Sequence, residues 1–172
     1  MDRVDRERLT AALPGFELGK VLGRGTSGVV MSGRDDLGRE VAIKVLAAHH
    51  DGAVASFKSE ARTLASLKNQ HIVQIYRYLE HGDLHLIIME LLAGGTLTEL
   101  RSSLAPEGSC AVGLAVAEAL SYAHLRGVLH RDIKPGNLVV GRDETGDLLK
   151  VTDFGISKIF EGSAATASAV VG

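Results

Sequence analysis

Hydrophobic and polar residues alternate in short runs through the first half of the chain, as they do in strands of a half-buried sheet. These runs, one of which ends in the β-branched stretch VAIKVL, predict five strands over residues 16–23, 29–32, 39–46, 72–79 and 84–90. Residues 35–38 and 80–83 have the Gly and Asp content of turns. The pattern therefore predicts an antiparallel meander.

A helical spacing of three to four residues interrupts this alternation between the third and fourth strands. Phe57, Ala61, Leu64 and Leu67 keep that spacing, and Ser56 stands where an N-cap is expected. The first half of the chain is thus predicted to contain one helix beside the five strands.

The second half begins with the glycine-rich stretch Ala93-Gly94-Gly95-Thr96 and is mainly helical in pattern. We expect a short helix over 97–101 and a longer one that starts at Pro106 and is closed by Gly127. The apolar side of the longer helix is predicted to carry Leu114, Ala117, Leu120 and His124. Two short strands follow over 137–140 and 148–151, and residues 163–168 are small and polar like a loop.

Composition and charge narrow the class of protein. The 172 residues suffice for one globular unit or for two small lobes around a cleft. The chain has no run of 18 or more apolar residues, its start is charged, and it contains one cysteine, so we expect a cytoplasmic protein without a membrane segment. A net charge of −2 without basic blocks argues against a nucleic-acid partner.

The stretch GRGTSGVV lies between the first two predicted strands. Its three glycines, Gly23, Gly25 and Gly28, let backbone N–H groups approach phosphate oxygens without interference from a Cβ atom. The same string also suits an ordinary glycine-rich hairpin. A dinucleotide-binding fold is disfavoured, because that fold requires a helix after the glycines and a strand follows here.

Lys44 interrupts the apolar third strand. Such a lysine either extends to water at a sheet edge or is held in a cleft by an anion and a carboxylate. Glu60 on the predicted helix is the natural carboxylate, although a solvated helix-face charge is the alternative for this residue.

The octet HRDIKPGN, which spans residues 130–137, and the triplet Asp153-Phe154-Gly155 complete a series with GRGTSGVV, VAIK and the helix glutamate. In this order and at these separations the motifs resemble those of the eukaryotic-type serine/threonine protein kinases, in a bacterial-like member. The resemblance implies an α+β, protein-kinase-like bilobal fold with a five-stranded antiparallel N-lobe, one helix and an incomplete helical C-lobe. We expect a lead-in over 1–13, the N-lobe over 14–92 and a partial C-lobe over 93–172 that ends inside the activation segment.

The resemblance also implies catalytic roles. Asp132 resembles the base that accepts or orients the proton of the substrate hydroxyl, and Lys134 is the form found in serine/threonine kinases, where it neutralises charge on the transferring phosphoryl group. Asn137 and Asp153 would bind Mg²⁺, or alternatively Mn²⁺. Lys44 would hold the α- and β-phosphates of ATP, with Glu60 fixing its position. A turn or cap role remains the alternative for the two aspartates.

An ATP site is implied at the hinge between the lobes. Met89 stands at the gatekeeper position, and the backbone of Glu90 and Leu92 is expected to bind adenine, with apolar side chains on either side of the ring. The alternative for the apolar members is an ordinary core position. The implied ATP-binding residues are Leu22, Gly23, Arg24, Gly25, Thr26, Ser27, Gly28, Val30, Ala42, Lys44, Met89, Glu90, Leu92 and Val139.

Other residues are implied to support or regulate the site. His130 is expected to pack under the catalytic loop in a hydrophobic column with Phe154, Leu64 and Ile75. Arg131 is expected to bind a phosphate on the activation loop. The acceptors available there are Ser163, Thr166 and Ser168.

Two functions of different class follow. The first is phosphoryl transfer from Mg-ATP to Ser or Thr hydroxyls of protein substrates, with autophosphorylation of the activation loop in the full-length form. The second is a truncated, non-catalytic nucleotide-binding or regulatory module that docks on a partner. ATP binding with transfer indicates the first, whereas binding without transfer indicates the second.

Overall fold

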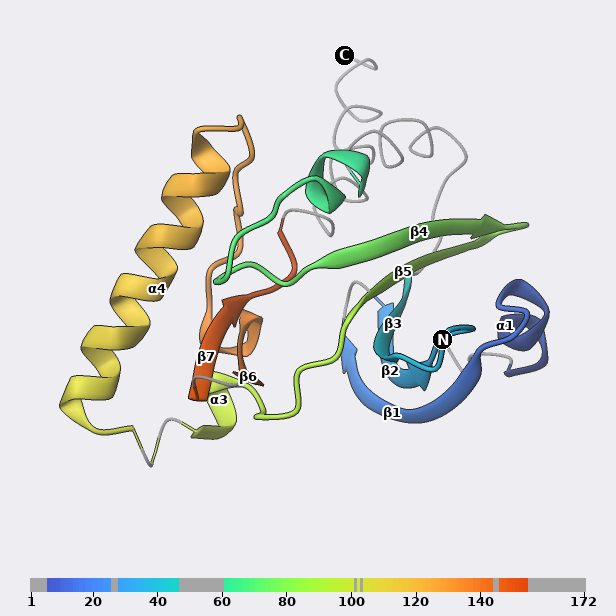
Figure 1. Ribbon diagram of the computed structural model, residues 1–172, viewed down its shortest axis with the longest axis horizontal. Coiled ribbons are helices and arrows are strands. Elements are labelled where there is room, and N and C mark those ends of the chain that lie inside the picture. Colours follow the sequence, from blue (N-terminus) through green and yellow to red (C-terminus); the bar gives the residue numbers. More distant parts are fainter. Residues whose placement is uncertain are drawn as a thin grey trace, which may run out of the picture.

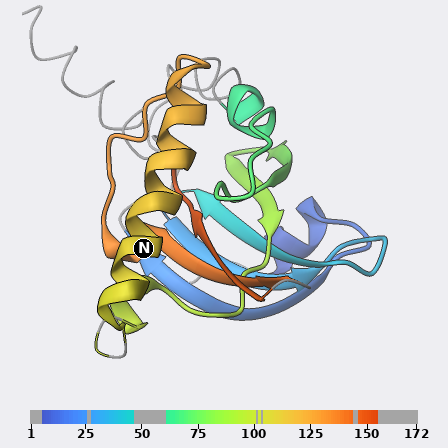
Figure 2. The same ribbon diagram turned by 60° about the vertical axis from the view of Figure 1, so that its left-hand side comes forward.

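The chain folds into two parts in the computed structural model, which describes residues 6–25, 28–46, 61–100, 102, 104–143 and 146–154. The sheet lobe contains α1 and β1 to β5, and the helical lobe contains α3, α4, a 3-10 turn η1, β6 and β7 (Figures 1 and 2). The elements are α1 (Arg6–Ala12), β1 (Glu17–Gly25), β2 (Gly28–Arg34), β3 (Glu40–Leu46), β4 (Ile75–His81), β5 (Leu84–Glu90), α3 (Leu97–Leu100), α4 (Pro106–His124), η1 (Pro135–Asn137), β6 (Leu138–Asp143) and β7 (Gly146–Val151).

The sheet lobe is a five-stranded antiparallel sheet in the order β1-β2-β3-β5-β4. The five predicted strands are present, but the fourth starts later than expected. Ile72 instead forms an isolated parallel bridge with Val151 of β7, and the N–H of Val73 donates to the carbonyl of Val151 at 3.0 Å. Residues 71–73 therefore link the two lobes through Val151, a contact that local alternation cannot reveal.

Helix α1 covers the outer face of the sheet. Within the lead-in expected over 1–13, residues 6–12 are helical. Leu9 and Leu13 are fully buried in an apolar cluster with alternate residues of the inner strands. Helix α1 itself lies on the side of the sheet lobe away from α4 (Figure 1). The sheet partners in this outer cluster are Met31, Val41, Ile43, Val45, Leu86 and Ile88.

The opposite face of the sheet shares one core with the helical lobe. Ala42, Leu46, Ile87 and Met89 belong to a cluster that extends through residues 61–75 to α4, β6 and β7. Residues 61–65 are helical, in agreement with the C-terminal part of the predicted helix, whereas Ser56, Phe57 and Glu60 lie outside the described residues. This inner cluster joins the two lobes.

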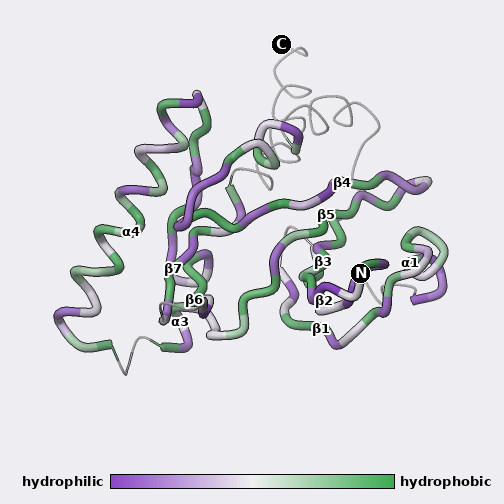
Figure 3. Tube along the Cα trace, in the orientation of Figure 1, coloured by the Kyte–Doolittle hydropathy of each residue, from purple (hydrophilic) through white to green (hydrophobic). Residues whose placement is uncertain are grey.

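Helix α4 packs on a face that was only partly predicted: Leu120 packs against the inner cluster, but Leu114, Ala117 and His124 are exposed. Leu114 is 72% exposed, and the buried residues are Ala115, Ala119 and Ala123, which recur every fourth position. Hydrophobic residues are interspersed all along α4 (Figure 3), so the apolar pattern alone did not select a face. The small alanine side chains let the helix approach β7 closely, and the larger leucine stays outside.

Two predicted element boundaries fall in the segment between α4 and β6. Gly127 has a φ of +73°, which suits the predicted helix stop. Asn137 was expected to begin a strand, but it ends η1, and β6 begins at Leu138. None of the described helices combines the length and apolar character needed to span a membrane.

Candidate active site

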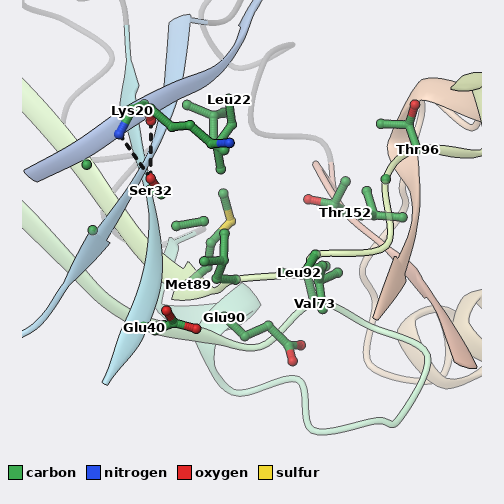
Figure 4. Close-up of a pocket in the computed structure, with 18 of the residues that line it drawn as sticks. Lys20, Leu22, Ser32, Glu40, Val73, Met89, Glu90, Leu92, Thr96 and Thr152 are labelled. Atoms are coloured by element: carbon green, nitrogen blue, oxygen red, sulfur yellow. Dashed lines mark hydrogen bonds between the residues drawn. The ribbon is translucent and has the colours of Figure 1, made fainter. Parts of the chain in front are cut away.

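A cleft of about 820 Å³ lies between the sheet lobe and the helical lobe. Its walls come from β1, β2 and β3, from the segment after β5, and from residues around β6 and β7. Met89 and Leu22 extend toward each other from opposite sides of it (Figure 4). The two lobes thus enclose the space where the sequence predicts a nucleotide.

The predicted apolar walls are brought together in this cleft. Of the implied ATP-binding residues, the cleft is lined by Leu22, Val30, Ala42, Met89, Glu90, Leu92 and Val139. Gly23, Arg24 and Gly25 at the end of β1 are not among the lining residues, and neither are Gly28 and Lys44. Thr26 and Ser27 lie outside the described part of the chain.

Gly28 shows why the glycine-rich stretch needs glycine where it turns into β2. Its φ is +132°, and a Cβ at this position would lie 2.0 Å from the carbonyl oxygen of Val45. No L-residue with a side chain fits there without moving β3. This glycine therefore sets the close approach of β2 to β3, whichever molecule occupies the cleft.

Lys44 points inward from β3 and is 2% exposed. Its Nζ lies 2.6 Å from Oδ1 of Asp153, just after β7. This pair joins two motifs that are 109 residues apart in sequence. A buried ammonium with a carboxylate partner contradicts the alternative of a lysine that extends to water at the sheet edge. The expected pairing with Glu60 lies outside the described residues.

Three residues of the octet 130–137 form a compact network. Oδ2 of Asp132 lies 2.8 Å from Nζ of Lys134 and accepts from Nδ2 of Asn137 at 3.1 Å. The hydrogen bond from Lys134 holds the pKa of Asp132 below its ordinary value, and Asp132 in turn raises the pKa of Lys134. Asp132 is therefore ionised near neutral pH and is chemically able to accept a proton.

Asn137 is 6% exposed and is held from two sides. Its Nδ2 donates to the carbonyl of Asp132 at 2.8 Å, and its own carbonyl accepts from the N–H of Thr152 at 2.9 Å. Because the amide nitrogen is used inside the loop, the amide oxygen is the atom that can bind a cation. Together with the Asp153 carboxylate it offers the hard oxygen ligands that Mg²⁺ prefers.

His130 braces the loop from below. Its Nδ1 accepts from the N–H of Asp132 at 3.2 Å, so Nε2 carries the proton and donates to the carbonyl of Thr152 at 2.8 Å. Burial lowers the pKa of His130, although the hydrogen bond to Thr152 and the carboxylates of Asp132 and Asp153 act in the opposite direction. The neutral ring thereby fixes the loop that carries Asp132.

The ring of His130 also packs on Phe154, with centroids 4.5 Å apart. Leu64 and Ile75, the other expected members of the hydrophobic column, belong to the same buried cluster as Phe154. The structure thus brings together the residues that the sequence grouped around His130.

Two residues of the site have a left-handed backbone without being glycine. Arg131 has a φ of +66° and Asp153 a φ of +61°. Each such conformation costs on the order of 1–3 kcal/mol, so the surrounding contacts must hold it in place. The predicted phosphate acceptors for Arg131, namely Ser163, Thr166 and Ser168, lie outside the described residues.

An ion pair between β5 and β7 was missed by the sequence reasoning. Nζ of Lys150 on β7 lies 2.8 Å from both carboxylate oxygens of Glu90, and Oε1 of Glu90 also accepts from the N–H of Gln74 at 2.6 Å. Both side chains of the pair are largely buried. Nothing local marks them as partners, because they are 60 residues apart.

The β1 wall of the cleft was also missed. Leu18, Gly19 and Lys20 line the cleft beside the expected Leu22. Lys20 and Leu22 are two residues apart, so the period of a strand was a usable signal for Lys20. Leu18 was harder to predict from the sequence, because the pairing of β1 with β2 shifts between Leu18 and Val21.

Comparison with known proteins places this geometry in a family. A model described as "Protein kinase domain" matches residues 16–172. A Streptomyces coelicolor protein named "Probable serine/threonine-protein kinase" is 38% identical over 171 residues, which is 91% of this chain and 25% of the relative. A Bifidobacterium longum protein named "Probable serine/threonine-protein kinase PknB" is 38% identical over 167 residues, which is 88% of this chain and 24% of the relative. The chain thus spans about a quarter of each relative.

Solved structures show the same fold. The kinase domain of Mycobacterium tuberculosis PknI, as a double mutant, superposes with a TM-score of 0.74 at 29% identity, over 84% of this chain and 62% of that one. Rad53 in complex with AMP-PNP superposes with a TM-score of 0.73 at 24% identity, over 83% of this chain and 38% of that one. The predicted protein-kinase-like bilobal fold, with a five-stranded antiparallel sheet and an incomplete helical lobe, is confirmed.

Proposed function

The chain belongs to the protein kinase family, and on that premise we propose that it carries out phosphoryl transfer from Mg-ATP to Ser or Thr hydroxyls of protein substrates. The observation that carries this proposal is one connected set of contacts along the cleft. Lys44 pairs with Asp153, the neighbouring Thr152 donates to Asn137, and Asn137 donates to Asp132. The set extends from the sheet lobe to the catalytic loop.

In this proposal adenine lies between the apolar walls, and its polar edge meets the backbone of Glu90 and Leu92. Lys44 binds the α- and β-phosphates and Glu60 positions it. Mg²⁺, or Mn²⁺ in its place, bound by Asn137 and Asp153, would neutralise phosphate charge. The nucleotide and the cation are supported by the enclosed cleft and by the oxygen ligands beside it, and Rad53 has been solved with AMP-PNP.

The transfer step follows from the placement of the loop residues. The substrate hydroxyl oxygen forms a bond to the γ-phosphorus while the bond from that phosphorus to the β–γ bridging oxygen breaks. The hydroxyl proton passes to the carboxylate of Asp132, which is ionised for this purpose. Lys134, 2.8 Å from that carboxylate, neutralises charge on the transferring group. ADP leaves with the bridging oxygen.

The choice of Ser or Thr as acceptor rests on Lys134 and on the names of the relatives. We further propose autophosphorylation at Ser163, Thr166 or Ser168, with Arg131 as the phosphate ligand. Because ATP is a cytoplasmic substrate, we propose a cytoplasmic location for this part of the protein. The partners in this proposal are protein substrates, without a nucleic acid.

Transfer of radiolabelled phosphate tests the proposal directly. The chain is incubated with labelled Mg-ATP and a generic Ser/Thr-containing protein, and incorporation into both proteins is measured. Asp132→Asn is expected to reduce transfer by about 10²–10⁴-fold. Asp147→Asn is the matched control, because Asp147 pairs with Arg142 at the exposed β6–β7 hairpin, outside the cleft. Its transfer should equal that of the unmodified chain.

One outcome would overturn the role of Asp132, and another would overturn transfer as the function. If labelling is equal in the Asp132→Asn variant and the unmodified chain, Asp132 is not the base. If Mg-ATP raises the melting temperature but no label is transferred, the chain is a non-catalytic nucleotide-binding module.

A further inference from the structure

Helix α1 precedes the matched kinase region, which begins at residue 16, and is nevertheless built into the sheet lobe. Leu9 is 0% and Leu13 is 1% exposed, both within the outer apolar cluster. A seven-residue helix is too short to be stable alone, so its conformation depends on this packing. The burial of Leu9 and Leu13 therefore fixes the position of α1 on the sheet, and with it the neighbours of the polar side chains of α1.

Arg6 at the start of α1 contacts the backbone of β1. One guanidinium nitrogen donates to the carbonyl of Gly19 at 3.3 Å and the other donates to the carbonyl of Leu18. These carbonyls lie where the pairing of β1 with β2 shifts between Leu18 and Val21. Within the same irregular segment, Oγ of Ser32 accepts from the N–H of Lys20 at 3.1 Å (Figure 4). Arg6 and Ser32 thus both bind residues 18–20 of β1, within the segment where the pairing shifts (the β1 bulge).

The bulge is also part of the wall of the cleft. Leu18, Gly19 and Lys20 line the cleft, and Leu22 follows on the same strand. A change in the bulge must therefore change how β1 presents Leu22 to the cleft, because a bulge sets the local twist of its strand. Because Arg6 binds two residues that line the cleft, the position of α1 can affect the shape of the cleft wall.

The same helix is attached at a second point. Arg8 forms an ion pair with Asp83 in the β4–β5 turn. Because β1 and β4 are the two edges of the sheet, α1 connects one edge strand with the turn that follows the other. The Arg8–Asp83 ion pair is solvent-exposed, and neither residue lines the cleft. It therefore attaches α1 to the sheet without contacting the cleft wall.

We propose that Arg6 is a positioning residue for nucleotide binding: through the carbonyls of Leu18 and Gly19 it holds the β1 bulge in the shape that places Leu22 over the adenine. This inference rests on the proposed ATP site. It adds α1, which lies outside the matched family region, to the nucleotide-binding unit. Arg6 acts only through β1 and touches neither nucleotide nor substrate.

The test compares Arg6→Gln, Arg6→Lys and the matched control Arg8→Gln. Affinity for Mg-ATP is measured by calorimetry, urea midpoints are measured on the same samples, and hydrogen exchange is followed at the amides of residues 18–22. Arg6→Gln is expected to weaken Mg-ATP binding by about 3–10-fold and to speed exchange in the bulge, since a charge-assisted hydrogen bond is lost. Arg6→Lys should restore part of the affinity, and Arg8→Gln should leave it unchanged.

The outcomes are separable from those of the proposed function. Equal Mg-ATP affinity in the Arg6→Gln and Arg8→Gln variants overturns the positioning role. A loss of affinity that both variants share, with the same fall in urea midpoint, also overturns it, because the effect is then only on stability. If the unmodified chain binds no Mg-ATP, the proposed function fails, and unchanged exchange in the bulge would then overturn the structural part of the inference as well.

Discussion

The two faces of β3 differ in what their residues contact, although they alternate along one strand. Val41, Ile43 and Val45 point to the outer cluster under α1, which contains only apolar residues. Ala42 and Lys44 point inward, where one wall of the cleft and the ion pair with Asp153 are found. Because successive side chains of a strand point to opposite faces, one short segment separates packing from chemistry.

The two faces should therefore respond differently to substitution, one mainly in stability and the other mainly in function. The outer face has no charge to compensate, so its contribution is the burial of apolar area. The inner face holds a buried ammonium whose desolvation is offset by a carboxylate, an arrangement that contributes little net stability. We therefore expect adjacent residues of β3 to give opposite phenotypes.

The largest expected effect is on the inner face. Lys44→Met removes the cation proposed to hold the phosphates, and transfer should fall by about 10²–10³-fold, as for loss of a preorganised charge-stabilising donor. The urea midpoint should fall only moderately, because the Asp153 carboxylate loses its cation but has a side chain that is 28% exposed and can be hydrated. Labelled-phosphate transfer and urea unfolding on one preparation measure both quantities. A lower midpoint together with full transfer would reverse the comparison.

The neighbouring residue should behave in the opposite way. Ile43 is 0% exposed, and Ile43→Ala should lower the free energy of unfolding by about 2–5 kcal/mol through lost burial and a cavity. Mg-ATP affinity of the folded protein should not change. Leu37→Ala, at a residue 85% exposed in the β2–β3 turn, is the matched control and should stay within about 0.5 kcal/mol. Weakened binding in Ile43→Ala without loss of stability would contradict the separation of faces.

A smaller effect is expected where the two lobes meet. Lys150 on β7 and Glu90 on β5 form a largely buried ion pair, and the backbone N–H of Gln74 also donates to the Glu90 carboxylate. A double-mutant cycle with Lys150→Met and Glu90→Gln should give a coupling free energy of about 0.5–3 kcal/mol. Urea unfolding of the four proteins measures it. Coupling that disappears in 1 M salt would show that the pair is solvated and does not join the lobes.

The sequence predicted the strands well, because alternation reports directly which residues are buried. It also grouped Lys44, Asp132, Asn137 and Asp153 into one site through their motifs. The Lys44 contact with Asp153 and the Lys150 contact with Glu90 were not predictable, since each joins segments far apart in the chain and depends on the final fold.

Two further features needed tertiary information. Helix α4 carries apolar residues on more than one side, and the choice of the Ala115, Ala119 and Ala123 face follows from close packing on β7. Helix α1 is too short for local propensity to decide between helix and frayed chain, and Leu9 and Leu13 decide it by burial.

The weakest effect should be a pH dependence of the free energy of unfolding, which arises from His130 packed on Phe154 of the inner cluster. Burial lowers the pKa of His130, so at pH values between its folded-state pKa and its ordinary value of 6.5 the unfolded chain binds more protons than the folded chain. The stability from the neutral ring is therefore complete above that ordinary value and is lost as the pH falls toward the folded-state pKa. Urea unfolding between pH 7.5 and 5.5 should show a smaller loss in His130→Gln than in the unmodified protein. Ile43→Ala should lower stability by the same amount at every pH, because nothing in the outer cluster titrates. Parallel pH profiles for His130→Gln and the unmodified protein would show that the inner cluster, on which His130 packs through Phe154, does not depend on a neutral histidine.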